Sequence, residues 1–415
     1  MARVMKDSGI EWIGEIPEEW GFARIGSLYT LRNTKVSDTD YPPLSVTNKG
    51  IVPQLETAAK TNAHDDRKLV KQGDFAINSR SDRRGSCGIS RYDGSVSLIN
   101  TILAPNSEMN PQYYDWLFHT VQFADEFYKW GHGIVDDLWT TGWQDMKRIV
   151  IPLPSLEEQE IIASFLDAEC ADIDALMADV QAQIETLEQY KRSVITEAVT
   201  KGLNPNVPMK AVDSVWITEI PATWQFMKAG YLFVERSVRA KGDETPLSLS
   251  QKDGLVITDE MTEHAMKSKT YDGWKKVWVN DLVLNRFKAH LGVFFCSKYN
   301  GMVSFHYGVY VPISKLNVKF YEYLFHSKPY CEMFADLSNG ITVGLQNLGN
   351  ANFYSAKCVY PSPAEQDKIV EYLDAKCAEI DAIIDGKRRQ LAVLEEYKKS
   401  IIFEYVTGKK EVPVA

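Results

Sequence analysis

One long segment of this chain occurs twice at a fixed spacing, and this repeat constrains the fold more than any other feature. The two copies cover residues 152–202 and 361–410. Glu158-Gln159 recurs as Glu365-Gln366, Leu166-Asp167-Ala168 as Leu373-Asp374-Ala375, and Tyr190-Lys191 as Tyr397-Lys398, each 207 positions later. A constant offset over such a stretch indicates a duplicated architecture.

Each copy has the apolar pattern of a coiled-coil helix. Apolar residues fall every seven positions, and they are Leu166, Ile173, Val180, Leu187 and Val194 in the first copy and Leu373, Ile380, Leu394 and Ile401 in the second. A second row lies three or four positions away, at Ile162, Leu176, Tyr190, Ile369, Ile383 and Tyr397. A strict seven-residue repeat makes two helices supercoil around a shared seam. We expect helices of roughly 40 to 44 residues, about 60 to 65 Å long.

Lys387 interrupts the seam of the second copy, at the place that Val180 holds in the first. A lone polar seam residue usually fixes the register of a coiled coil at a cost in stability. A lysine can equally extend its ammonium group out of the seam into water. Both interpretations fit the sequence.

The duplication extends into the parts outside the helices. WIGEIPEEW at 12–20 returns as WITEIPATW at 216–224, GDFAIN at 73–78 as NDLVLN at 280–285, and YYDWLFHT at 113–120 as FYEYLFHS at 320–327. The short alternating runs at 74–77 and 281–284 predict strands, and the segments at 113 and 320 predict short helices. The repeated unit is therefore a globular domain followed by a long helix, with domains at 1–154 and 204–360 and helices within 155–203 and 361–415.

The order of these parts predicts the architecture. The first helix leaves the first domain, and the second domain begins soon after this helix ends, so the helix separates the two domains. A shared seam then requires the second helix to return antiparallel. We expect an α+β fold, with two pseudo-symmetric globular domains separated by a long antiparallel two-helix coiled coil.

Composition limits the class of protein. The 415 residues are 45% hydrophobic and 25% charged, as in ordinary soluble proteins. No run of 18 apolar residues and no secretory signal pattern occurs, which argues against a membrane protein. The six cysteines lack CxxC spacing, which argues against a disulfide framework or a zinc site and favours the cytoplasm.

The negative charge of the chain is concentrated in the first helical segment. The net charge is −10, and residues 155–203 hold 11 acidic but only 3 basic residues. Residues 204–360, in contrast, hold 17 basic and 14 acidic residues. The globular domains could thus present a local basic surface to DNA, and a partner protein would supply further positive charge.

Taken together, these repeated motifs resemble the specificity subunit of type I restriction-modification systems. The features that carry the resemblance are the WIGEIPEEW and WITEIPATW starts, the GDFAIN and NDLVLN strands, and the helix entries PLPSLEEQ and PSPAEQ. The resemblance implies two target-recognition domains, double-stranded DNA as ligand, and two methylation subunits as partners, with restriction subunits in the full complex. It places adenosylmethionine, ATP and Mg²⁺ in those partner subunits, so no cofactor is expected in this chain.

The sequence contains no recognisable catalytic motif. GxxxxGK[ST], a GxGxxG after a strand and an Asn-Pro-Pro-Tyr-like methyltransferase motif do not occur in it. The histidines at 264, 290, 306 and 326 are too scattered for a metal site. We therefore expect a non-catalytic chain.

The strongest candidates for DNA contact follow the repeated strand of each domain. They are Arg80, Arg83, Arg84 and Arg91 in the first half, and Arg286, Lys288 and His290 in the second. Arginine can bind guanine through two hydrogen bonds, and the nearby Gly85, Gly88 and Gly292 permit a close approach of the backbone. A solvated arginine loop is the plainer alternative.

Two further pairs of loops are candidates. One pair is the turn with Asn48 and Lys49 and its counterpart with Gln251 and Lys252, because Asn and Gln can read adenine. The other comprises the loop that starts at Gly133 and its counterpart with Gly340 and Gln346. A hairpin turn without DNA contact is an equally good interpretation of the first pair. The recurring tryptophans at 12, 20, 216 and 224 are expected in the core.

These observations predict a DNA-recognition subunit that reads a bipartite, asymmetric target, because the loops of the two halves differ. The paired helices would set the gap between the half-sites and dock the methylation subunits. A coiled-coil scaffold that does not bind DNA is one rival hypothesis, and an enzyme with unrecognised motifs is the other.

Overall fold

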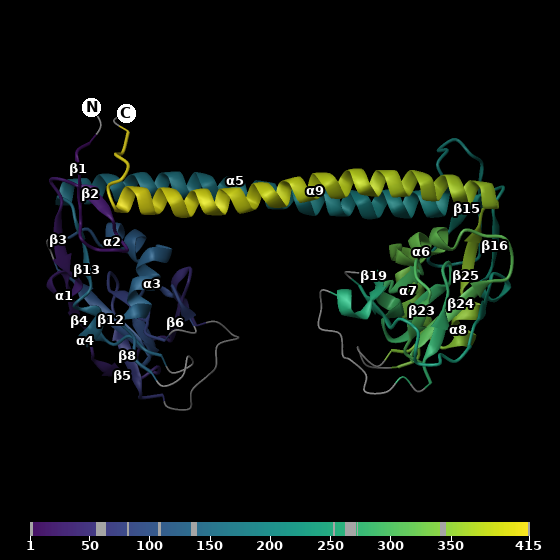
Figure 1. Ribbon diagram of the computed structural model, residues 1–415, viewed down its shortest axis with the longest axis horizontal. Helices are drawn as coiled ribbons and strands as arrows, with labels where there is room; N and C mark the ends of the chain where they lie inside the picture. The colour runs from purple at the N-terminus through teal and green to yellow at the C-terminus, as the bar shows by residue number, and fades with distance from the viewer. Residues whose placement is uncertain are drawn as a thin grey trace. The chain divides into compact units, whose positions relative to one another are not determined.

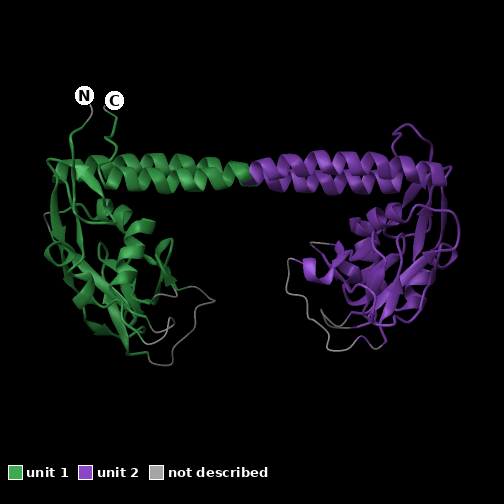
Figure 2. Ribbon diagram, viewed as in Figure 1, with its two compact units in different colours: residues 1–181, 389–415 green, residues 182–388 purple. Residues whose placement is uncertain are grey.

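The computed structural model describes residues 3–54, 64–80, 83–106, 109–133, 139–251, 254–261, 271, 273–340 and 346–413. The chain forms two compact units (Figure 2). Unit 1 comprises residues 1–181 and 389–415, and unit 2 comprises residues 182–388. Each unit therefore combines one globular part with one half of each long helix, and the C-terminal residues pack with the first globular part.

The long helices are α5 (Leu156–Lys201) and α9 (Pro363–Val406). The globular part of unit 1 contains β1 (Met5–Asp7), β2 (Glu15–Pro17), β3 (Gly21–Arg24), α1 (Ile25–Leu28), β4 (Tyr29–Leu31), β5 (Lys35–Val36), β6 (Leu44–Thr47), β7 (Gly50–Pro53), β8 (Arg67–Val70), β9 (Phe75–Asn78), β10 (Cys87–Ile89), β11 (Gly94–Ser97), β12 (Asn100–Pro105), α2 (Pro111–Phe118), α3 (Val121–Lys129), α4 (Trp143–Met146) and β13 (Val150–Leu153). The predicted strand at 74–77 and helix at 113 correspond to β9 and α2.

Unit 2 has nearly the same order of elements, but its described residues contain no strand that corresponds to β5 and include the 3-10 helices η3, η4 and η5. Its globular part contains β14 (Met209–Ala211), β15 (Glu219–Pro221), β16 (Gln225–Lys228), η3 (Ala229–Tyr231), β17 (Phe233–Glu235), β18 (Leu247–Ser250), β19 (Gly254–Ile257), η4 (Thr258–Glu260), β20 (Lys275–Val277), β21 (Leu282–Asn285), η5 (Arg286–Leu291), β22 (Phe294–Cys296), β23 (Gly301–Val303), β24 (Tyr307–Pro312), α6 (Val318–His326), α7 (Lys328–Leu337), α8 (Asn350–Ser355) and β25 (Lys357–Tyr360). The predicted strand at 281–284 and helix at 320 correspond to β21 and α6.

The central sheets of the two units have equivalent topology. Unit 1 has the strand order β10-β9-β12-β4, and unit 2 has the order β22-β21-β24-β17. All pairings within these sheets are antiparallel. The duplicated sequence thus folds into a duplicated sheet, and the prediction of an α+β fold with two pseudo-symmetric globular parts and two long helices is confirmed.

Aromatic side chains join the helices to the sheet in each unit. In unit 1, the Phe118 ring lies 4.9 Å from that of Phe75 and 4.5 Å from that of Phe123. In unit 2, the Phe294 ring lies 5.0 Å from that of Phe325. Trp12, Trp20 and Trp224 are buried and Trp216 packs against the core of its unit, so the prediction that these tryptophans belong to the core is confirmed.

The two helices run side by side (Figure 1), and contacts in both units show that they are antiparallel. In unit 1, Lys398 donates to Asp174, and in unit 2, Lys191 donates to Asp381. A residue later in α5 therefore contacts a residue earlier in α9, which is the order expected of antiparallel helices. The two pairs are also equivalent in the repeat, because each residue has its counterpart 207 positions away.

The first row of the seam is where the sequence predicted it. Leu166, Ile173, Val180, Leu373, Ile380 and Ile401 are buried, and Leu187, Val194 and Leu394 are half-buried. Lys387 is also half-buried.

The prediction for the second row is wrong at four positions. Leu176, Tyr190, Ile383 and Tyr397 are between 43 and 49% exposed. The buried second row lies four residues after the first and contains Cys170, Ile184, Ala198, Cys377, Ile384 and Tyr405. The pattern misled because several true seam residues are small, whereas large apolar side chains stand on the neighbouring exposed face.

The repeated Glu-Gln pair joins each long helix to its globular part. Buried Gln159 donates to the Pro154 carbonyl oxygen and accepts from the Asn110 backbone N–H, at 2.9 Å in both cases. Gln366 makes the equivalent bonds with Pro361 and Asn317 in unit 2. Asn110 and Asn317 cap helices α2 and α6, so one glutamine fixes the start of two helices.

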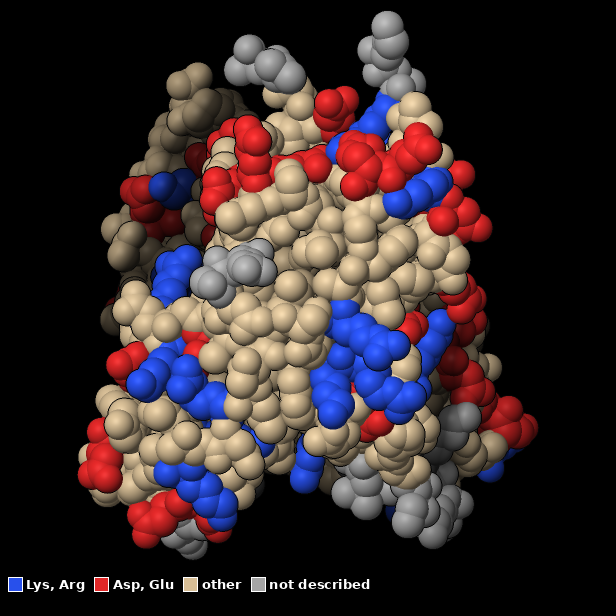
Figure 3. Space-filling model, turned by 90° about the vertical axis from the view of Figure 1, so that its left-hand side faces the viewer, with Lys and Arg blue, Asp and Glu red and all other residues tan. Residues whose placement is uncertain are grey.

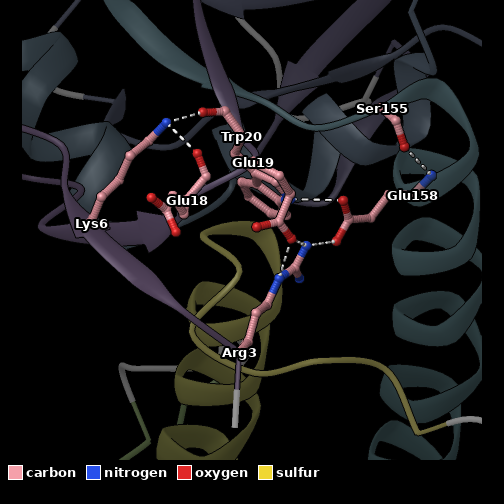
Figure 4. A network of polar contacts seen from close by, with 7 residues as sticks. All are labelled: Arg3, Lys6, Glu18, Glu19, Trp20, Ser155 and Glu158. Carbon is pink, nitrogen blue, oxygen red and sulfur yellow. Dashed lines mark hydrogen bonds and ion pairs between the residues drawn. The ribbon is translucent and has the colours of Figure 1, made fainter. Parts of the chain in front are cut away.

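Glu158 connects the start of α5 to the start of the chain (Figure 4). Its carboxylate accepts a hydrogen bond of 2.7 Å from the Trp20 indole N–H and one of 2.5 Å from Arg3. Arg3 also donates to Glu19, and Lys6 donates to the Trp20 carbonyl oxygen. The WIGEIPEEW and Glu-Gln motifs therefore contact each other in the folded unit.

Candidate nucleic-acid interface

The loop after β9 is a tight turn that exposes its arginines. The Asn78 side chain accepts from the Arg80 backbone N–H at 3.0 Å. The Ser86 N–H donates to the Arg83 carbonyl oxygen at 3.1 Å, and Gly85 has a positive φ of 74° that favours glycine. Arg80, Arg83 and Arg84 are all exposed around this turn.

Arg84 is oriented by two neighbours on α3. It forms an ion pair with Asp125, and its guanidinium carbon lies 5.5 Å from the centre of the Tyr128 ring. Tyr128 in turn stacks on Trp139, with ring centres 5.7 Å apart. The side chains of Arg84 and Asp125 are about half exposed, so such a pair contributes only up to about 1 kcal/mol. The contacts orient Arg84 without burying it, and the aromatic neighbours were missed in the sequence.

The turn with Asn48 and Lys49 lies against the strand that follows this loop. A Cβ atom on Gly88 of β10 would stand 2.8 Å from the Gly50 Cα, so the two backbones touch at a pair of glycines. The Thr47 hydroxyl accepts from the Lys49 N–H at 3.1 Å and closes the turn. Asn48 and Lys49 project outward and are exposed.

The third predicted loop of unit 1 meets the same region. Thr140 pairs with both Arg80 and His132 as isolated bridges, and the Thr141 N–H donates to the Ser79 carbonyl oxygen at 2.9 Å. Gly133, which follows His132, is exposed. The structure therefore brings together, at the end of β9, the backbone segments from which two predicted loops of unit 1 extend.

Arg91 does not join this group. It lies past the opposite end of β10, where its charge acts on Asp115 of α2. Burial raises the pKa of the Asp115 carboxyl group above its ordinary value, while His119 and Arg91 act to lower it. Arg91 is exposed, but this position separates it from the turn of Arg83 and Arg84.

Unit 2 has the same framework with different side chains. The Leu348 N–H donates to the Arg286 carbonyl oxygen at 3.0 Å, which is the equivalent of the bond from Thr141 to Ser79. Asn339 and Asn347 pair with each other at the base of the loop that contains Gly340 and Gln346. Gly340 is exposed and Gln346 is half-buried. Gln251 is exposed in the turn after β18, and Lys252 lies outside the described residues.

Arg286 is a member of an interior polar network. Its guanidinium donates to Glu235 at 2.7 Å and to the Asn350 side-chain oxygen at 2.6 Å, and Lys275 also donates to Glu235. Only 20% of the Arg286 side chain is exposed. Burial alone would raise the pKa of Glu235, but the hydrogen bonds from Lys275 and Asn350 lower it below its ordinary value. This network favours a structural role for Arg286 over a contact with DNA.

The other candidates on η5 differ in exposure. Lys288 is exposed, and His290 is half-buried with a buried Nδ1 atom that finds no partner within the described part of the chain. The exposed basic group of unit 2 is therefore smaller than that of unit 1. Among the described residues, no cluster of His, Cys, Asp and Glu could hold a metal ion, and no helix is long and apolar enough to cross a membrane.

Charge is divided on the surface of unit 1 that Figure 3 shows. Lysine and arginine side chains form patches across the middle of this face, whereas acidic side chains gather near the chain ends at the top and also lie along its lower edges.

Comparisons with known proteins place this fold in context. Residues 17–186 match the family model of the type I restriction modification DNA specificity domain. The predicted resemblance to type I specificity subunits is confirmed. A proposed type I restriction enzyme MjaX specificity subunit from Methanocaldococcus jannaschii is 24% identical, over 96% of each chain. The MjaVIII specificity subunit of the same organism is 27% identical over 51% of this chain and 49% of that protein.

Two solved structures have a fold similar to that of this chain. A chain from a structure of complex assembly and conformational transition of a type I R-M system matches with a TM-score of 0.70 at 14% identity, over 95% of this chain and 99% of that one. The HsdS subunit from Thermoanaerobacter tengcongensis matches with a TM-score of 0.52 at 14% identity, over 95% and 98% of the two chains. Duplicated units with two long helices are thus a shared architecture.

Proposed function

We propose that this chain is the non-catalytic DNA-recognition subunit of a type I restriction-modification complex, and that each unit reads one half of a bipartite, asymmetric target. The observation that carries the proposal is the pair of equivalent loop frameworks at the ends of β9 and β21, which hold different side chains. Equivalent frameworks would meet DNA in the same way, and different side chains would read different bases.

In unit 1, we assign DNA contact to Arg80, Arg83 and Arg84, with Asn48 and Lys49 on the adjacent turn. In unit 2, the assigned residues are Lys288 and Gln251, together with the loop of Gly340 and Gln346. Arginine and glutamine can read base edges, whereas lysine suits phosphate as a point charge. Arg91 and Arg286 are left out because of their positions.

The helices would set the gap and dock the partner subunits. Leu176 and Ile383 are exposed at equivalent positions of the repeat, as are Tyr190 and Tyr397. Large apolar side chains that stay exposed at the same place in both copies fit a surface that partner proteins cover. Two methylation subunits would bind there and carry adenosylmethionine, and restriction subunits would bring ATP and Mg²⁺ chemistry in the full complex. Such a complex would act in the cytoplasm.

The test is to map methylated adenines in cells that co-express this chain with its methylation subunit. The wild-type complex should methylate one bipartite target with two unlike halves. The double substitution Arg83→Ala and Arg84→Ala should relax one half only, because each good base contact contributes about 1 to 3 kcal/mol of discrimination. A methylation pattern that ignores these two arginines would contradict the assignment, and the absence of any sequence-specific DNA binding would support the scaffold alternative.

A further inference from the structure

A patch of aromatic side chains on unit 2 is not used by the contacts assigned above. Phe287 is 40% exposed and Phe305 is 53% exposed. The His306 ring contacts both, with ring centres 3.9 Å from Phe305 and 5.7 Å from Phe287. Single exposed apolar residues are ordinary on protein surfaces, but two exposed phenylalanine rings joined by an exposed histidine ring form a patch.

The patch lies on well-defined backbone at the end of the central sheet. Phe305 is part of a turn that a hydrogen bond of 3.0 Å closes, from the Tyr307 N–H to the Ser304 carbonyl oxygen. Tyr307 pairs with Asn285 across β24 and β21. The Asn285 side chain accepts from the Phe287 N–H at 3.1 Å. Both phenylalanines are therefore held in place before any ligand binds.

The surroundings of the patch are positively charged. Lys275 donates to the Tyr307 carbonyl oxygen at 2.9 Å, directly behind the turn. Lys275 and Arg286 share the single carboxylate of Glu235, so this network has an excess of one positive charge. Lys288, next to Phe287, is exposed and adds another. A positive rim around an apolar patch suits a polyanion that also offers apolar surface, and DNA combines phosphates with stacked bases.

Unit 1 has an exposed apolar side chain at the equivalent turn. Leu98 precedes Phe305 by 207 positions and is 38% exposed. Its turn is closed by a hydrogen bond from the Asn100 side chain to the Ser97 carbonyl oxygen. The next residue, Ile99, accepts from the Ser79 N–H at 3.2 Å, so the turn adjoins the loop of Arg80. The repeat thus keeps an exposed apolar residue at this place while its identity changes.

We propose that Phe305 in unit 2 and Leu98 in unit 1 are apolar wedges that contact the base stack of double-stranded DNA at a base step, with Phe287 enlarging the wedge in unit 2. The proposal rests on the proposed DNA-recognition function. Inserted Phe and Leu side chains partly unstack a base step and kink the duplex, and the additional buried surface offsets the cost of unstacking. A wedge would make each half-site sensitive to the deformability of one step, beside the bases that polar side chains read.

The experiment uses the complex of this chain with its methylation subunit and a duplex that carries the target found by methylation mapping. 2-Aminopurine replaces one base at a time along each half-site, because its fluorescence rises when it is unstacked. Methyltransferases flip their target base out of the stack, so the position of the methylated adenine is expected to be fluorescent in every variant that binds. We expect one further position in the unit 2 half-site to become fluorescent with the wild-type complex. Phe305→Ala should abolish that signal and weaken binding about tenfold, with an unchanged salt dependence, because an apolar contact releases no counterions.

Lys288→Ala is the matched control on the neighbouring element. It should reduce the slope of binding against salt by about one ion and keep the 2-aminopurine signal. Phe305→Leu, which introduces the side chain that unit 1 uses, should keep part of the signal. A partly retained signal in Phe305→Leu would also show that unit 2 folds without the aromatic ring of Phe305.

Three results would overturn the wedge. One is normal affinity and an unchanged 2-aminopurine signal with Phe305→Ala. Another is a Phe305→Ala variant that fails to assemble with the methylation subunit, which would make the patch a protein contact. The third is equal loss of the signal in Phe305→Ala and Lys288→Ala, which would point to general weakening of binding. A wild-type complex without affinity for the mapped duplex would refute the proposed function as well.

Discussion

The loops after β9 and β21 share a backbone framework, but the first exposes its arginines and the second holds Arg286 largely inside the fold. In unit 1, Arg84 is on the surface beside Asp125, whereas in unit 2, Arg286 donates into the interior to Glu235. The residues of unit 1 that are equivalent to Arg286 and Glu235 are Ser79 and Leu31. Lys275 does have an equivalent, Lys68, which donates to the Asn100 carbonyl oxygen as Lys275 donates to that of Tyr307. The same place in the fold therefore holds a network of three charged residues in unit 2 and only the lysine in unit 1.

The residues that hold the central sheet beside these loops are much more similar in the two units. Asp74 is buried and pairs with Arg32 in unit 1, and Asp281 is buried and pairs with Arg236 in unit 2. Each partner in unit 2 is the repeat equivalent of its counterpart in unit 1. Duplication has kept the residues that hold the sheet, and the side chains at the end of the sheet have diverged. A charged residue beside the loop is thus insufficient evidence for contact with DNA.

The largest effect that separates the two loops is expected from Arg286→Ala. This substitution removes the hydrogen bonds from Arg286 to Glu235 and Asn350, and Lys275 is then the only cation paired with Glu235 among the described residues. Loss of one member of such a largely buried charged network costs about 3 kcal/mol. The free energy of unfolding of the whole chain, measured in urea, should fall by about that amount. Arg84→Ala is the matched control and should change it by less than about 0.5 kcal/mol, because its ion pair is exposed. Equal losses of unfolding free energy in Arg286→Ala and Arg84→Ala would contradict this difference between the two loops.

A second difference concerns pH. Burial lowers the pKa of His326 in unit 2 to about 4, although its Nε2–H donates to the Phe294 carbonyl oxygen at 2.7 Å. The unfolded chain binds this proton near pH 6.5, so stability is full above about pH 6.5 and declines as the pH falls towards 4. We expect the free energy of unfolding to fall by roughly 2 to 3 kcal/mol between these two pH values.

The measurement is urea unfolding at pH values between 7 and 4. His326→Gln should remove most of this part of the pH dependence, because glutamine does not titrate and can still donate to the carbonyl oxygen. His119→Gln, the equivalent substitution in unit 1, is the control for general effects at this helix position. A pH profile that does not change with His326→Gln would mean that other groups cause the decline.

A third and smaller difference is expected at the helix entries. Glu158 accepts from Trp20 and Arg3, whereas the Trp224 indole N–H in unit 2 has no partner among the described residues. Glu158→Ala should therefore cost about 1 to 2 kcal/mol, since it removes two hydrogen bonds to a charged group. Glu365→Ala in unit 2 should cost clearly less. Thermal unfolding of both variants checks this order, and equal shifts in Tm would contradict it.

The sequence was sufficient to predict the architecture because the repeat provides an internal alignment. The strands at 74–77 and 281–284 and the two long helices needed only periodicity and spacing. The second seam row could not be predicted, because the pattern favoured large residues such as Tyr190 over small ones such as Cys170. Which apolar face is buried depends on packing, and side-chain size alone does not determine it.

The candidate site was harder to predict than the fold. Arg80 and His132, the residue before Gly133, are far apart in sequence, but both pair with Thr140, and spacing cannot show this. The interior position of Arg286 depends on Glu235, 51 residues earlier. Charge in a loop after a strand identifies an exposed arginine in the case of Arg84 and a half-buried one in the case of Arg286. The sequence does not reveal which arginine finds a carboxylate inside the fold.

The smallest expected effect lies in the helices, where the two units should behave alike. The Lys398–Asp174 pair of unit 1 and the Lys191–Asp381 pair of unit 2 are repeat equivalents, each with a distance of 2.6 Å and a largely exposed aspartate. Exposed pairs of this kind contribute up to about 1 kcal/mol and weaken with salt. Double-mutant cycles with alanine should therefore give similar coupling energies of about 0.5 kcal/mol for both pairs at low salt. Since the Lys and Asp of each pair come from different helices, the coupling reports on the helix pairing itself. A coupling confined to one unit would mean that the divergence of the loops after β9 and β21 extends into the helices, and the two units would then differ in framework as well as in the side chains of these loops.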